Sequence, residues 1–105
     1  MLEKHQNIAK KFKELVSKKI KVHELIVYHS EEDKEAPGYS NLDLFIVVDE
    51  LNRKVEGYIV DCAWEVGFNE DALLLAFPIS KSELENGHNS SPWPIENIYS
   101  NGIRI

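Results

Sequence analysis

Two polar side chains stand at the start of the most apolar segment of the chain, and their types and spacing could support chemistry on phosphates. The segment covers residues 40–50, and its centre, 42–48, is rich in β-branched and aromatic residues. That composition predicts a strand buried on both faces. Asn41 and Asp43 are two residues apart, so both side chains leave one face of this strand at its start. A carboxylate there can hold a divalent cation against a phosphate. Alternatively, Asp43 ends the preceding polar loop and hydrogen-bonds to it.

The positions of the other residues that often act in catalysis or metal binding do not indicate a site. His29 and Ser30 are neighbours at the end of a predicted strand, and adjacent strand residues point to opposite faces, so they do not form a nucleophile pair. Four histidines are scattered without the spacing typical of metal ligands, and we expect no histidine metal site: His5, His23, His29 and His88.

Cys62 is the single cysteine, which excludes an internal disulfide and fits a reducing cytoplasm. It lies on the apolar stripe of a predicted helix, so we expect it in the core. Trp64 lies off that stripe, and Trp93 follows a proline in a turn. We expect both tryptophans to pack against the sheet, with a role as interface anchors as the alternative.

Length and charge limit the possible functions. The chain has 105 residues, enough for one domain, and its formal net charge of -6 argues against a broad nucleic-acid surface. The first residues lack the apolar stretch of a secretory signal, and no apolar run is long enough to cross a bilayer. Residues 1–23 carry seven lysines against two glutamates, a net of +5, whereas the remainder carries -11. This basic segment could attract an acidic partner or a second copy of the chain; alternatively, it is a solvated helix face.

The order of predicted elements indicates an α/β (α+β) domain over residues 1–105, a small mixed sheet with helices packed on one face. Strands over 20–29 and 42–48 are joined by a polar loop without a helix, which favours antiparallel neighbours. A helix over 51–67, with Gly67 as its stop, gives the next strand room for a crossover connection. Pro78 suggests a sheet edge or the end of that strand. The predicted strands cover 20–29, 42–48 and 72–79. The predicted helices cover 2–19, 51–67, a stretch from a capping box at Ser80 to Gly87, and 93–100. The tail, 103–105, can return to the sheet.

This order and one motif resemble the minimal nucleotidyltransferases of the DNA polymerase beta superfamily. That family's signature is Gly-Ser at the end of the first strand, ten residues, and then Asp-x-Asp. Here His29-Ser30 is followed by ten residues, 31–40, and by Asn41-Leu42-Asp43. The stretch 41–50 and the ending 91–103 are also similar to the family's. The resemblance implies the nucleotidyltransferase fold and a Mg²⁺-dependent transfer of a nucleoside monophosphate from a triphosphate. It implies that Asp43 and Asn41 are catalytic, that Asp43 binds the metal, and that Ser30 and His29 contact the nucleotide.

The chain departs from the family pattern at chemically important positions. His29 replaces the glycine whose backbone approaches the phosphates, and Asn41 replaces a metal-binding aspartate. No carboxylate lies in the third predicted strand, where the family's third metal ligand is expected. The loop before the motif contains acidic residues, and two unit charges 4 Å apart interact by about 4 kcal/mol at an effective dielectric near 20. An acidic loop would therefore oppose triphosphate binding, and we predict weak or lost transferase activity.

Three functions follow from the resemblance. The first is a transferase that uses Mg²⁺ and a nucleoside triphosphate. The second is a non-catalytic, antitoxin-like or regulatory partner of a helical HEPN-type protein, or a homodimer, because small relatives commonly act by pairing. The third is a nucleotide sensor without turnover. We expect neither a nucleic-acid nor a membrane partner.

Overall fold

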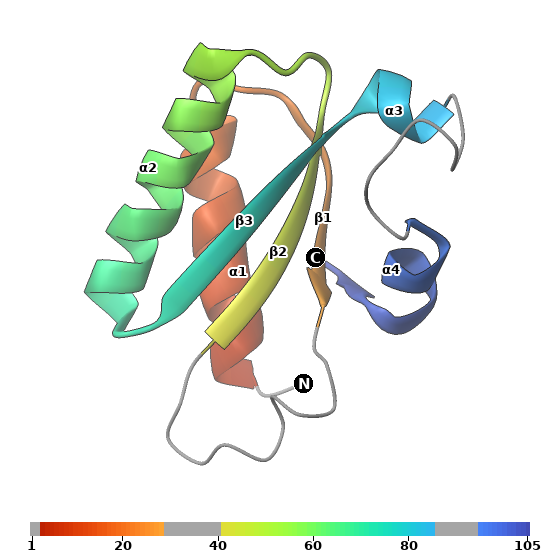
Figure 1. Cartoon of the computed structure of the whole chain (residues 1–105). Helices are drawn as coiled ribbons and strands as arrows, with labels where there is room; N and C mark the ends of the chain where they lie inside the picture. Colours follow the sequence, from red (N-terminus) through yellow and green to blue (C-terminus); the bar gives the residue numbers. More distant parts are fainter. Residues whose placement is uncertain (1–2, 29–40, 86–94) are drawn as a thin grey trace.

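The computed structural model describes residues 3–28, 41–85 and 95–105, which surround a four-stranded sheet (Figure 1). The strands lie in the order β3-β2-β1-β4. Their bounds are β1 Val22–Tyr28, β2 Asn41–Val48, β3 Leu73–Ser80 and β4 Ile103–Arg104. The helices are α1 Glu3–Ser17, α2 Arg53–Glu70, α3 Lys81–Glu85 and α4 Ile95–Asn101.

The sheet is mixed, as the sequence predicts. β2 runs antiparallel to β1 and parallel to β3, and α2 provides the connection that a parallel pair needs. The tail returns to the sheet, because β4 pairs with β1 through Ile103 and Arg104. Pro78 lies in β3, the edge strand, where the N–H that proline lacks is not needed for a ladder.

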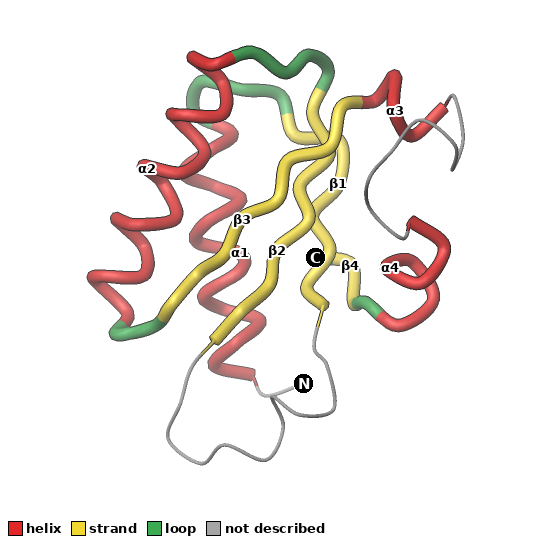
Figure 2. The backbone as a smooth tube through the Cα atoms, viewed as in Figure 1, coloured by secondary structure: helices red, strands yellow, loops and turns green. Residues whose placement is uncertain are grey.

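The two long helices cover one face of the sheet (Figure 2). Their apolar stripes meet the even-numbered residues of β2, because side chains alternate between the two faces of a strand. This core is closed to solvent. Its fully buried members include Phe12 and Val16 from α1, Leu44 and Ile46 from β2, and Ile59 from α2.

The opposite face holds a second, smaller core under α4. Ile98 of α4 packs with Ile26, Phe45, Val47 and Ile79 of the sheet. The prediction of helices on one face therefore holds for the two long helices, while the short α4 lies on the other side. A seven-residue helix with only Ile95 and Ile98 buried gives too weak a periodic signal to show which face it covers.

The predicted ends of α2 were wrong at both termini. Asn52 is the N-cap, and its side chain accepts a hydrogen bond of 2.9 Å from the Val55 N–H, so the helix begins at Arg53 and Leu51 lies outside it. The helix continues past Gly67 to Glu70, and Asp71 takes the left-handed conformation at its end. Gly67 is needed for close packing instead, because a Cβ there would lie 2.6 Å from the Ala72 carbonyl oxygen.

Two shorter helix signals are confirmed. Ser80 Oγ accepts a hydrogen bond from the Glu83 N–H at 3.1 Å and contacts the Glu83 carboxylate at 3.2 Å, which is the predicted capping box of α3. Gly102 follows the end of α4, and its N–H donates to the Ile98 carbonyl at 2.8 Å. The predicted end of α3 at Gly87 lies outside the described residues.

Candidate functional site

The structure places Asn41 and Asp43 at the start of β2. Asn41 is the first residue of the strand, and Asp43 is half-buried on the face away from the two long helices. Asp43 pairs in register with Tyr28, the last described residue of β1, and with Leu75 of β3. His29 and Ser30 lie outside the described residues.

Aromatic side chains surround this end of the sheet. Phe45 lies two residues after Asp43 on the same strand; its ring meets Tyr28 edge-on at 6.2 Å and stacks on Phe77 at 5.1 Å. Asn97 of α4 donates a hydrogen bond of 3.3 Å to the Tyr28 hydroxyl. We call Tyr28, Phe45 and Phe77 the aromatic cluster. Phe45 is buried, so the cluster belongs to the smaller core and follows Asp43 along β2.

β3 contributes leucines beside the two motif residues. Leu73 pairs in register with Asn41 and Leu75 with Asp43, and the two leucine side chains are 37% and 39% exposed. They follow the odd-numbered face of β3, because their neighbour Leu74 belongs to the core under the long helices. The β3 positions in register with Asn41 and Asp43 therefore carry no carboxylate.

The donor set does not fit the two-ion arrangement that the resemblance implies. Such a site uses three carboxylates to hold two Mg²⁺ ions against phosphate oxygens. Within residues 3–28, 41–85 and 95–105, no group of three or more His, Cys, Asp or Glu side chains is close enough to hold a metal. Among the described strand residues, Tyr28 and Leu75 are in register with Asp43, and neither is acidic.

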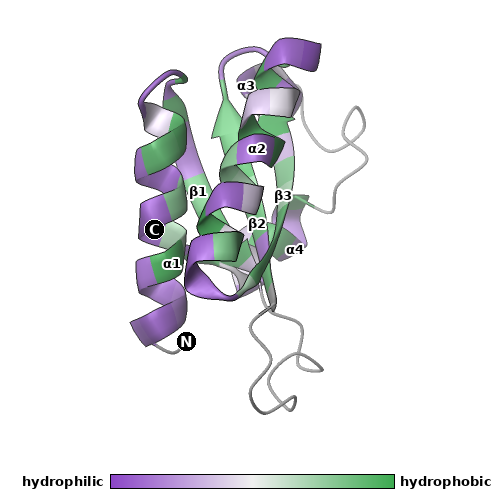
Figure 3. Ribbon diagram, turned by 90° about the vertical axis from the view of Figure 1, so that its left-hand side faces the viewer, coloured by the Kyte–Doolittle hydropathy of each residue, from purple (hydrophilic) through white to green (hydrophobic). Residues whose placement is uncertain are grey.

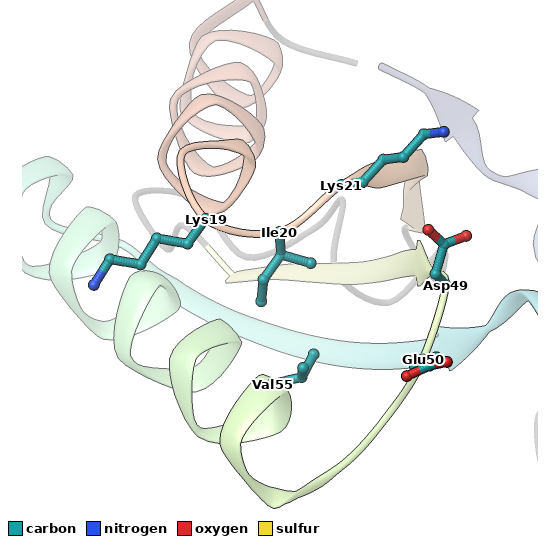
Figure 4. A pocket seen from close by; sticks show the side chains of 6 residues that line it. All are labelled: Lys19, Ile20, Lys21, Asp49, Glu50 and Val55. Carbon is teal, nitrogen blue, oxygen red and sulfur yellow. The ribbon is translucent and has the colours of Figure 1, made fainter.

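A second polar group lies at the other end of β2 and was not found from the sequence. His23 and Asp49 form a side-chain contact, and this hydrogen bond lowers the pKa of the Asp49 carboxyl. Nearby, a groove is lined by the following residues (Figure 4): Lys19, Ile20, Lys21, Asp49, Glu50 and Val55. His23 and Asp49 are 26 residues apart, so no local spacing pointed to the pair.

This groove does not gather its cations as a phosphate site would. In Figure 4, Lys21 extends on the side of Asp49, whereas Lys19 extends along α2 on the other side. The Lys19 ammonium lies 5.2 Å from the centre of the Tyr58 ring, a contact within the fold. Since two carboxylates also line the groove, its charges balance, and we assign it a structural role.

A third polar group attaches the end of the chain to the sheet. The Tyr99 hydroxyl donates to the Glu24 carboxylate, and Arg104 lies 3.5 Å from that carboxylate and 5.0 Å from the centre of the Tyr99 ring. Burial, together with the bond to Glu24, raises the pKa of Tyr99 to about 12. The group links α4, β1 and β4, and its phenol is too weak an acid for proton transfer near neutral pH.

The remaining predicted residues divide between confirmation and correction. Cys62 is buried in the core, and burial raises the pKa of its thiol, so it is not an activated nucleophile. Trp64 does not pack against the sheet as predicted, because its side chain is 69% exposed on α2. Trp93 lies outside the described residues.

Comparisons with family models, with curated proteins and with solved structures find no match to this chain. The family resemblance stays a prediction that depends on the motif and its spacing. In the part of the chain that the structure describes, none of the helices combines the length and the apolar character needed to cross a membrane.

Proposed function

We propose that this chain is a nucleotidyltransferase-fold protein related to Mg²⁺-dependent transferases of nucleoside monophosphates, with weak or lost transferase activity. The observation that carries the proposal is the register at Asp43. Its neighbours across the sheet are Tyr28 and Leu75, so the strand expected to supply another metal ligand supplies a leucine. Asn41 adds at most a neutral oxygen, which is a poorer ligand for Mg²⁺ than a carboxylate.

The charges of the substrate explain why this loss matters. A triphosphate carries several negative charges, and transferases of this class neutralise them with metal ions during an in-line displacement. In the proposed site, Asp43 would bind Mg²⁺ when a nucleotide is present, with Asn41 assisting. Ser30 and His29 are the proposed contacts to the nucleotide. One carboxylate supports weak metal binding, and we therefore expect little turnover.

A second candidate is a non-catalytic, antitoxin-like or regulatory partner, with a helical HEPN-type protein as its proposed binding partner. The favouring observation is that α2 exposes Trp64 and Phe68, and large exposed aromatic side chains often anchor protein interfaces. We propose the cytoplasm as the compartment, since Cys62 is a single thiol kept buried and reduced.

Calorimetric titration with ATP and Mg²⁺ separates these functions. We expect a dissociation constant of about 1 mM or weaker, because the site lacks the positive charges that would neutralise a triphosphate. Micromolar binding that requires Mg²⁺ and disappears in Asp43→Ala would instead establish a nucleotide site. Asp61→Asn is the matched control, because Asp61 is an exposed aspartate on α2, on the other face of the sheet.

A nucleotide sensor would give a third pattern. Its binding would be micromolar and would be lost in Asp43→Ala. Prolonged incubation with radiolabelled ATP would neither transfer a nucleoside monophosphate to the chain nor release pyrophosphate. The proposed function predicts neither tight binding nor transfer.

A further inference from the structure

The outer side of α2 carries large apolar side chains that nothing in the described fold covers. Val60, Trp64 and Phe68 are 45%, 69% and 87% exposed. They recur every four residues and so follow one another along one side of the helix. Gly57 precedes them on the same side, and a Cβ there would meet no atom within 4 Å. We call Gly57, Val60, Trp64 and Phe68 the outer stripe.

The outer stripe faces away from the other long helix. The opposite flank of α2 contacts α1: the Tyr58 hydroxyl donates to the Leu15 carbonyl at 2.8 Å, and Glu70 pairs with Lys11. Buried residues such as Ile59 and Val66 point to the sheet. The remaining side of the helix lies next to β3, the edge strand, and Figure 3 looks onto this part of the molecule.

We propose that the outer stripe binds the outer stripe of a second copy of this chain, with the two α2 helices antiparallel across a two-fold axis. An axis passing α2 near residue 62 places Val60 of each copy beside Trp64 of the other. It also places the large Phe68 beside Gly57, where there is no side chain to displace. A large residue opposite a glycine is the size match that close helix packing needs.

Charge favours the same antiparallel arrangement. Arg53 and Lys54 stand in the first turn of α2, and Asp71 follows its last residue. Each charge lies at the end where the dipole of its own helix disfavours it. In an antiparallel pair, the basic end of one helix meets the acidic end of the other, so Arg53 comes beside Asp71 of the second copy. The first turn also holds Glu56, so charge favours this arrangement through the pairing of Arg53 with Asp71, while the outer stripe itself matches in size.

The expected interface is small, and the proposed dimer is reversible. A Trp or Phe side chain can bury roughly 150–250 Å², so two of each supply about 600–1,000 Å² before Val60 and the charged ends are added. Specific interfaces bury about 1,200–2,000 Å² in total. A dimer with a dissociation constant in the micromolar range follows. This inference does not depend on nucleotide binding.

Sedimentation velocity over a concentration series tests the proposal without nucleotide. We expect the 12.1 kDa chain to convert to twice that mass as its concentration rises to about 100 µM. Trp64→Ala with Phe68→Ala should weaken association by at least about thirtyfold, the effect of losing central aromatic anchors. Leu73→Ala is the control, because Leu73 is exposed on the other face of the sheet. Circular dichroism should show every variant folded, since the changed side chains are exposed.

Two further variants separate the proposed geometry from general stickiness. Gly57→Leu adds an apolar side chain where Phe68 of the second copy should lie, so we expect association at least about tenfold weaker. If the helices associated only through non-specific apolar contact, the added leucine would instead strengthen association. Arg53→Glu should also weaken the dimer, and Arg53→Lys should not. A chain that stays monomeric at about 100 µM, or a dimer that tolerates the loss of Trp64 and Phe68, would overturn the proposal.

Discussion

The two faces of the sheet differ in how completely they are covered. The face under α1 and α2 has a continuous dry core, in which Leu42, Leu44, Ile46 and Val48 of β2 are all buried. The other face has a smaller core under α4, and it leaves Leu73 and Leu75 partly exposed beside Asn41 and Asp43. β2 is therefore buried along its whole length under the long helices, whereas on the other side Phe45 and Val47 are buried and only its start, at Asp43, is half-buried.

This difference shows where the chain can change without losing its fold. Substitutions on the helix-covered face leave cavities or buried charges, and the fold depends on that face. The start of β2 and β3 on the other face carries less of the packing. A catalytic site built there could lose its acidic ligands to leucines at little cost to stability, which is what we propose for this chain.

Two neighbouring leucines of β3 test the difference between the two faces of the sheet most strongly. Leu74 is buried under the long helices and Leu75 is partly exposed beside Asp43. We expect Leu74→Asp to lower the free energy of unfolding by about 4 kcal/mol or more, because it buries an unpaired charge. Leu75→Asp should lower it by about 1 kcal/mol or less. Urea unfolding of both variants checks the pair, and equal losses would contradict the difference between the faces.

Gly67→Ala tests how tightly the chain turns at Ala72, between α2 and β3. The new methyl group would lie 2.6 Å from the Ala72 carbonyl oxygen, which is too short for a van der Waals contact. We expect a loss of about 2 kcal/mol in the free energy of unfolding, as for other overpacked sites. Gly57→Ala is the matched control, since its Cβ meets nothing, and it should stabilise the helix by up to about 1 kcal/mol. Stabilisation by both substitutions would show that Ala72 does not approach Gly67 so closely.

A smaller effect is expected from the cap of α3, the helix that carries Leu84, which packs against the smaller core under α4. Ser80→Ala removes the side chain that accepts the Glu83 N–H. We expect a loss of about 1 kcal/mol in thermal or urea unfolding. Ser80→Thr keeps a hydroxyl acceptor and should recover most of the lost stability. If Ser80→Ala leaves the free energy of unfolding unchanged, the cap does not stabilise this end of β3.

The smallest effect concerns alkaline pH. The raised pKa of Tyr99, about 12, reflects burial and its bond to Glu24. The folded state keeps the phenol protonated after the unfolded chain has begun to lose that proton near pH 10. The stability that Tyr99 contributes is therefore complete below about pH 10 and is lost as the pH rises toward 12.

Absorbance titration at alkaline pH measures this directly. Tyr99→Phe should remove one tyrosine that ionises late, and Glu24→Gln should let Tyr99 ionise earlier. If Tyr99→Phe leaves the late part of the titration unchanged, Tyr99 does not have the environment described above.

The fold was largely predictable because its signals are local. The burial of β2 on both faces and the stripe of Ile8, Phe12 and Val16 on α1 each follow from the apolar pattern of the sequence. The capping box at Ser80 and Gly102 after α4 follow from the requirements of helix ends. The prediction of Gly67 as the helix stop was wrong because the need for a glycine there depends on how the chain turns back at Ala72, which no local pattern gives.

The candidate site was predictable only in part. The period of two in β2 places Asn41 and Asp43 on one face, but register with β3 decides which side chains stand beside them. No sequence pattern gives that register, so Leu75 as the neighbour of Asp43 had to come from the structure. The pairing of His23 with Asp49 was missed for the same reason. Trp64 was misassigned because propensity favours burying tryptophan, whereas its position on α2 turns it outward.

The most direct test of the proposed loss is a Mg²⁺ titration of the chain by nuclear magnetic resonance, followed at the backbone amides of residues 41–43 and 73–75. We expect that the wild-type shifts do not saturate by about 10 mM Mg²⁺, because Asp43 lacks acidic neighbours on β3. The variant Asn41→Asp with Leu75→Asp, which supplies two more carboxylates, should saturate at about 1 mM or below. Saturation of the wild-type chain below about 1 mM at these residues would contradict the account.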